Sequence, residues 1–274
     1  MLKPASQRSR IVIAFFAVTL FGVLEYYRTF SFASLIPHPS PYVKNTSWRM
    51  ADGLTFLLIA FFLTPKMRRY LRLPSLRKRW LPLLGITNFV LLPYFSDIYA
   101  FRHDLSDLAR GTYWVFAIGF TEELFSRFLI FGLLTRYVGL WPAMVISSIN
   151  FGMMHLGNLH QDGQGLQETL LQVSNAVSFG FMMVALLIYF RSIWVPILMH
   201  AFSDFSLSIG PYRPSATRTT GGITGHGLGL IDWATSFTLS AIHIAIALAL
   251  LYRVRLLRKS PKIQGLLHYF GLTE

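Results

Sequence analysis

The sequence predicts an all-α, polytopic integral membrane protein with about eight transmembrane helices. Three observations favour this fold class: an apolar composition, long apolar segments repeated along the chain, and an uneven distribution of basic residues. Hydrophobic residues make up 53% of the 274 positions and charged residues only 14%, against roughly 25% charged residues in an ordinary globular domain. The composition disfavours a soluble single-core enzyme and excludes a disordered chain.

Apolar segments of transmembrane length recur from one end of the sequence to the other. A helix needs about 20 apolar residues to cross the hydrocarbon core of a bilayer. The second segment has only a short uninterrupted apolar run, because Arg49 and Asp52 lie near its start. The eight expected helices are Ile11–Tyr27, Ser47–Thr64, Leu81–Phe101, Tyr113–Leu134, Leu140–Gly157, Thr169–Phe190, Ile193–Gly210 and Ile231–Tyr252.

The distribution of basic residues agrees with eight crossings. Lys and Arg gather in the cytoplasmic loops of membrane proteins. The eight segments divide them into 17 on one side and 7, including Arg49, on the outer side, with Arg127 inside a span. All six Trp residues fall at expected span ends, where an indole ring prefers the membrane interface. We therefore expect both termini in the cytoplasm, with the basic tail 253–274 resting on the anionic leaflet.

The remaining composition limits the organisation and the chemistry. The net charge of +13 fits Lys and Arg that flank membrane helices, so the expected partner is the lipid bilayer and not nucleic acid. Cys is absent, which excludes disulfides, thiolate metal sites and thiol catalysis. The sequence shows no internal repeat and no second domain, so residues 1–274 are expected to form a single membrane domain.

Ionisable side chains inside three expected helices predict a functional site. A charged side chain at the centre of a bilayer costs about 2.5–3.5 kcal/mol on insertion scales, so by default it marks a site of chemistry. Residues four apart on a helix share a face, and the candidates include such pairs. They are Glu122, Glu123 and Arg127 in the fourth segment, Phe151 and His155 in the fifth, and His200 and Asp204 in the seventh.

The estimated depths of three of these side chains allow them to meet. At a rise of about 1.5 Å per residue, Glu122 lies about 18–21 Å, His155 about 22 Å and His200 about 10–12 Å from the cytoplasmic helix ends. One carboxylate and two imidazoles in a common cavity form a set that activates water or binds a cation.

The two adjacent glutamates are expected to play different parts. Glu123 precedes Arg127 by four residues, the favourable order for an ion pair within one helix, so this pair is interpreted as structural. Glu122 has no such partner in its own helix and is the better candidate for a general base. His243, a single histidine in the eighth segment, is interpreted as a helix-packing residue.

Three motifs in order, each on a separate apolar segment, resemble those of a known family. Glu122, Glu123 and Arg127 fit EExxxR, Phe151 and His155 fit FxxxH, and His200 with Asp204 fits HxxxN/D. On these residues the sequence resembles the CPBP family of CAAX proteases and bacteriocin-processing enzymes, also called the Abi family, which includes the Rce1-type CAAX prenyl endopeptidases. The motif-bearing core covers about residues 113–210.

The resemblance implies a glutamic-type intramembrane peptidase, in the cell (plasma) membrane of a prokaryote. It implies that Glu122 is the general base that deprotonates water, with His155 helping to position it. Glu123 and Arg127 brace the helix that carries the base, and Phe151 supports the site. Neither a cofactor nor a metal is needed.

His200 and Asp204 correspond, by the same resemblance, to the residues that stabilise the oxyanion. Rce1-type enzymes carry Asn at the position of Asp204. Because an ionised Asp cannot donate a hydrogen bond, Asp204 is either protonated or orients His200, and we favour orientation.

Other functions stay open at this point. A metal-dependent membrane protease would use Glu122, His155 and His200 as zinc ligands, although the sequence has no HExxH. A transporter would use the same buried charges for proton relay, and an immunity-type scaffold would keep the motifs without turnover. For the peptidase we expect a membrane-anchored or lipidated protein as substrate, cleaved in the cytoplasmic half or at the midplane of the bilayer.

Overall fold

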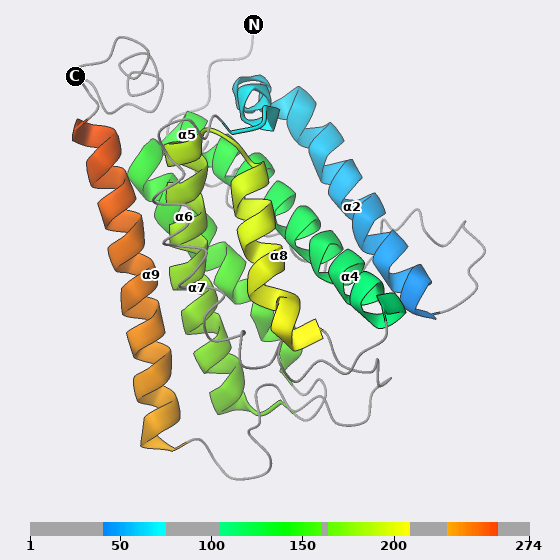
Figure 1. Cartoon of the computed structure of the whole chain (residues 1–274). Coiled ribbons are helices and arrows are strands. Elements are labelled where there is room, and N and C mark those ends of the chain that lie inside the picture. Colours follow the sequence, from blue (N-terminus) through cyan, green and yellow to red (C-terminus); the bar gives the residue numbers. More distant parts are fainter. Residues whose placement is uncertain (1–40, 75–104, 160–163, 209–228, 257–274) are drawn as a thin grey trace, which may run out of the picture.

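The computed structural model describes residues 41–74, 105–159, 164–208 and 229–256 (Figure 1). These residues form helices and contain no strand, so the all-α class is confirmed for the described part of the chain. The elements are α2 (Pro41–Leu63), η2 (Pro65–Leu71), α4 (Leu105–Glu123), η3 (Leu124–Phe131), α5 (Gly132–Val138), α6 (Leu140–Met154), η4 (His155–Asn158), α7 (Leu166–Phe190), α8 (Trp194–Ser208) and α9 (Leu230–Leu256).

Six of the eight expected segments overlap described helices, although α2 and α4 begin at Pro41 and Leu105, before the expected Ser47 and Tyr113. The fourth segment corresponds to α4, η3 and α5, which form one continuous rod because Glu123 and Gly132 at the two junctions keep helical backbone angles. The first and third expected segments, Ile11–Tyr27 and Leu81–Phe101, and most of the basic tail lie outside the described residues. Two described helices, Leu166–Phe190 and Leu230–Val254, are long and apolar enough to cross a membrane. The total of eight crossings stays a prediction.

Helix α7 lies at the centre of the bundle, and this position explains why the second half of its sequence is almost entirely apolar. It packs against α6 on one side and α9 on another, while α4 packs against α8 and α2 (Figure 1). Residues 182–190 of α7 are all buried in the main hydrophobic core. By contrast, only 22% of the apolar part of α9 is buried, so an apolar face of this helix is left for lipid.

A polar seam joins α9 to α7 and contains His243. The ring Nδ1 of His243 lies 3.1 Å from Ser178 Oγ. Asn175 donates to Ser236 Oγ at 2.8 Å and accepts from Ser240 Oγ at 2.9 Å. Such hydrogen bonds hold helices together in an apolar medium, so the helix-packing role predicted for His243 is confirmed.

Most basic residues of the described part of the chain gather at one end of the bundle. Figure 1 shows η2, the α5–α6 junction, the α7–α8 junction and the end of α9 at this end, with the starts of α2 and α4 at the other. Backbone and side-chain contacts tie these parts together: Ile193 N–H donates to Tyr70 O and Trp194 Nε1 to Leu71 O, both at 2.8 Å. The basic side chains at this end are Lys66, Arg68, Arg69, Arg72, Arg136, Arg191 and Arg253.

The predicted topology requires the basic residues to lie at the cytoplasmic end of the bundle. The sidedness of the two ends can be tested by labelling. Because the chain has no Cys, single cysteines act as unique labels. We expect Lys66→Cys to react with a membrane-impermeant maleimide only after the cytoplasmic face is opened, and Leu230→Cys to react in intact cells. Labelling of both positions from the same face would contradict the predicted topology.

Two glycines allow helix backbones to touch near the candidate residues. A Cβ atom at Gly119 in α4 would lie 2.8 Å from Ile197 O and 3.0 Å from Ala201 N in α8. A Cβ atom at Gly152 in α6 would collide with Val177 in α7. Small residues at crossings of this kind are the usual means of close helix approach in membranes.

The contact at Gly119 predicts that Gly119→Ala destabilises the protein by about 1–3 kcal/mol, the usual cost of overpacking. The added methyl group meets backbone atoms on both sides of His200, which cannot move without shifting α8. Thermal unfolding in detergent measures the effect. Gly165→Ala serves as the control, because its Cβ would meet only Glu168 Oε2 at 3.7 Å. Equal melting temperatures for the two variants would refute the tight crossing.

Candidate active site

The two glutamates lie where the α-helix α4 gives way to a π-helix. Glu122 and Glu123 end α4, and the eight residues of η3 that follow are a π-helical stretch. All eight side chains of η3 are buried. Single π-helical turns inside α-helices occur often at functional sites, and here the wider turn immediately follows the paired carboxylates.

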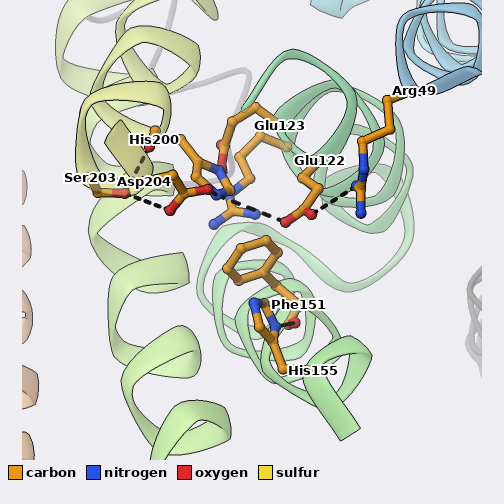
Figure 2. A network of polar contacts seen from close by, with 9 residues as sticks. Arg49, Glu122, Glu123, Phe151, His155, His200, Ser203 and Asp204 are labelled. Carbon is orange, nitrogen blue, oxygen red and sulfur yellow. Dashed lines mark hydrogen bonds and ion pairs between the residues drawn. The ribbon is translucent and has the colours of Figure 1, made fainter. Parts of the chain in front are cut away.

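Glu123 is the buried centre of the site (Figure 2). Its Oε1 accepts a hydrogen bond from His200 Nδ1 at 2.8 Å, and its Oε2 lies 3.1 Å from Arg127 Nε. The side chain of Glu123 is 0% exposed and that of Arg127 is 1% exposed. The ion pair four residues apart that the sequence predicts is therefore present, and Glu123 also links α4 to α8.

Arg127 is held by charge and by an aromatic ring. Its guanidinium carbon lies 4.1 Å from the centre of the Phe151 ring, a favourable cation–π geometry. Among the described residues none of its three side-chain nitrogens has a hydrogen-bond partner, so the contact with Glu123 is mainly Coulombic. Gly180 leaves room for the group, since a Cβ there would lie 3.3 Å from Arg127 Nη2.

His155 lies where α6 ends, earlier than the sequence predicts. The fifth expected segment extends to Gly157, but α6 stops at Met154 and His155 begins the short helix η4. His155 Nδ1 lies 3.0 Å from Phe151 O. A carbonyl oxygen only accepts, so Nδ1 carries the proton, which leaves Nε2 of a neutral ring as a proton acceptor.

Phe151 separates the two imidazoles. Its ring centre lies 5.2 Å from that of His155 and 5.7 Å from that of His200, in both cases edge to face. The residue that the sequence analysis assigned a supporting part thus contacts three of the other candidates.

Glu122 lies at the more open side of the cluster, with 14% of its side chain exposed. Its Oε2 is 3.8 Å from His200 Nε2, and its Oε1 is 3.3 Å from Arg49 Nη1 (Figure 2). The sequence analysis counted Arg49 among the charges on the outer side. In the structure its side chain reaches the candidate base. Arg49 lies inside the expected span Ser47–Thr64. The rule that a charged residue inside a span marks a functional site would therefore have identified it.

Asp204 faces the ring of His200 from the same helix. Its Oδ2 lies 3.5 Å from His200 Nε2, and Ser203 Oγ donates to its Oδ1 at 3.3 Å. The orientation of His200, which the sequence analysis assigned to Asp204, has a second and closer source in Glu123 at Nδ1. The two nitrogens of His200 therefore face carboxylates on opposite sides of the ring.

The zinc alternative requires His, Asp or Glu side chains that converge on one point. Within the described ranges no three His, Asp or Glu side chains form a group that would hold a metal ion. Metal content itself stays open to measurement.

The site thus combines a buried pair of Glu123 and Arg127, a partly exposed second carboxylate and two histidines, a set of groups suited to acid–base chemistry. Residues 104–206 match the family model described as Type II CAAX prenyl endopeptidase Rce1-like. This match confirms the family resemblance drawn from the three motifs, and the matched stretch contains all seven motif residues. No curated protein and no solved structure matches the chain. Helices α2 and α9 lie outside the matched residues.

The buried ion pair predicts a large effect of breaking it. We expect Arg127→Met to destabilise the protein by about 3–5 kcal/mol, because the buried charge of Glu123 loses its counterion. Glu123→Gln in the same chain should restore part of the loss. Thermal unfolding in detergent compares these variants with Arg136→Met, which changes an exposed arginine that donates to Leu63 O. If Arg127→Met is as stable as Arg136→Met, the pair is not structural.

Proposed function

We propose that this protein is a glutamic-type intramembrane endopeptidase that hydrolyses a peptide bond of a membrane-anchored or lipidated protein. The observation that carries the proposal is the placement of Glu122, a partly exposed carboxylate facing His200 Nε2 beside a fully buried ionic cluster. The Rce1-like family match supports a protease over a transporter or scaffold that uses the same charges.

The first step activates water. Glu122 accepts a proton from a water molecule, and His155 Nε2, left unprotonated by the contact of Nδ1 with Phe151 O, helps to hold that water. The resulting hydroxide attacks the carbonyl carbon of the scissile peptide. The proton taken from water then passes to the leaving amine, so Glu122 returns to its starting state.

The second requirement is stabilisation of the oxyanion. His200 in its doubly protonated form donates from both nitrogens: Nδ1–H to Glu123, and Nε2–H toward the developing negative charge. Asp204 faces Nε2 at 3.5 Å and orients the ring from the open side. A donor fixed before the reaction is the most effective form of such stabilisation.

The surroundings of the cluster suit hydrolysis inside a membrane. Glu123, Arg127 and Phe151 are almost completely buried, so the ionic contacts act in a medium of low dielectric constant. The mechanism needs no metal and no covalent nucleophile. We place the enzyme in the cell membrane of a prokaryote, with its substrate entering from the bilayer.

The proposal predicts that Glu122→Gln lowers kcat by at least about 100-fold, the usual contribution of a general base. Membrane-protein termini from cells that carry wild type, Glu122→Gln or Glu168→Gln are compared at matched expression. Glu168 caps the start of α7, away from the cluster, and Gln is tolerated in that role. A set of termini present with wild type and Glu168→Gln, but absent with Glu122→Gln, is the expected result.

Identical termini in all three strains, with the proteins folded, would overturn the peptidase function. Metal analysis of the purified protein provides a separate check on the mechanism. Stoichiometric zinc, together with loss of activity to a chelator, would replace the metal-free mechanism by the metalloprotease alternative.

A further inference from the structure

We propose that Arg49 determines substrate specificity by binding a carboxylate of the peptide substrate close to the scissile bond, and that this binding releases Glu122. The inference rests on the proposed function, because it treats Glu122 as the general base. It concerns a residue of α2, which lies outside the stretch matched by the family model.

The backbone of α2 is fixed beside the site. Thr121, which directly precedes Glu122, donates its hydroxyl hydrogen bond to Arg49 O. At Gly53, one turn further along α2, a Cβ atom would lie 2.7 Å from the Phe120 ring. The guanidinium of Arg49 lies 5.5 Å from the centre of the Trp114 ring. These contacts hold the cation at the edge of the cluster.

The contact of Arg49 with Glu122 leaves donors of the guanidinium unused. Arg49 Nη1 lies 3.3 Å from a single oxygen of Glu122, longer than the roughly 2.7–2.9 Å of a strong charge-assisted bond. Arg49 Nε is buried and has no hydrogen-bond partner among the described residues. Since a guanidinium matches a carboxylate through two parallel N–H groups, a second carboxylate can bind Arg49 better than Glu122 does.

Arg49 is also the cation of the cluster that an incoming substrate meets. Its side chain is 31% exposed, whereas that of Arg127 is 1% exposed and enclosed by Glu123 and the Phe151 ring. In Figure 2, Arg49 lies at one end of the row of charged side chains, with Glu122 between it and His200. A peptide that places its carbonyl between Glu122 and His200 therefore passes within reach of Arg49.

This geometry links recognition to catalysis. While Arg49 Nη1 lies 3.3 Å from Oε1 of Glu122, the guanidinium occupies one acceptor site of that oxygen and competes with water for it. A substrate carboxylate that takes the guanidinium frees the oxygen at the moment when the peptide is in place. Because an extended chain spans about 3.3–3.6 Å per residue, the carboxylate lies about two or three residues from the scissile bond. Its source is a free C-terminus or an acidic side chain.

The test uses three farnesylated fluorogenic peptides. The first has a free C-terminal acid, the second is its C-terminal amide, and the third is that amide with the last residue replaced by Glu. We expect wild type to favour a carboxylate-bearing peptide over the plain amide by about 10- to 100-fold in kcat/KM. The free acid and the Glu-bearing amide distinguish the two sources. Arg49→Gln should abolish this preference in both kcat and KM, because the carboxylate both binds Arg49 and frees Glu122. Arg49→Lys should retain part of the preference.

Arg110→Gln is the matched control, since it removes an arginine of α4 about 18 Å along the helix from Glu122 and should keep the preference. Equal rates of wild type on acid and amide would overturn the inference and leave the peptidase function standing. Equal loss on all peptides in Arg49→Gln would reduce Arg49 to a structural role. If wild type cleaves none of them, calorimetric titration of the same peptides still decides: tighter binding of the carboxylate peptides, lost in Arg49→Gln, supports Arg49, and equal binding refutes it.

Discussion

The arrangement of the bundle depends on the cost of burying the charge of Glu123. A carboxylate that is 0% exposed is stable only with a counterion and a hydrogen bond, and these come from different elements: Arg127 from η3 and His200 from α8. Arg127 in turn needs the ring of Phe151 in α6 and the space beside Gly180 in α7. One ionic contact thus fixes the relative positions of four helices. The candidate base and the candidate oxyanion donor acquire their geometry as a result, because Glu122 directly precedes Glu123 in the chain and His200 is hydrogen-bonded to Glu123.

Much of this could be predicted from sequence because burial of charge in an apolar chain is a strong signal. The pairing of Glu123 with Arg127 follows from a spacing of four residues within one helix. The packing role of His243 follows from its isolation in an apolar segment. The family match over residues 104–206 covers the same residues that the motifs identified. In each case the information lies within a single segment or in the order of segments, which a sequence displays directly.

The missed contacts are those that depend on the register between helices. No spacing rule relates Arg49 to Glu122 or Glu123 to His200, since these pairs are 73 and 77 positions apart and lie on separate helices. Arg49 was counted with the basic residues of the outer side because it lies near the start of the second expected segment. The end of α6 at Met154, three residues earlier than expected, is a local effect: the His155 ring donates a hydrogen bond to the carbonyl of Phe151 where α6 gives way to η4.

The contact of α4 with α8 at Gly119 has a consequence for the energetics of the reaction. Because the two backbones touch within a few residues of Glu122 and His200, the distance between these side chains is set by main-chain atoms and not by flexible side-chain packing. In water, solvent dipoles must turn as negative charge builds on an oxygen, and this reorganisation contributes to the barrier. A bundle with dipoles held by main-chain contact has done this work during folding. The glycine that lets the helices approach so closely therefore belongs to the catalytic design as much as the ionisable groups do.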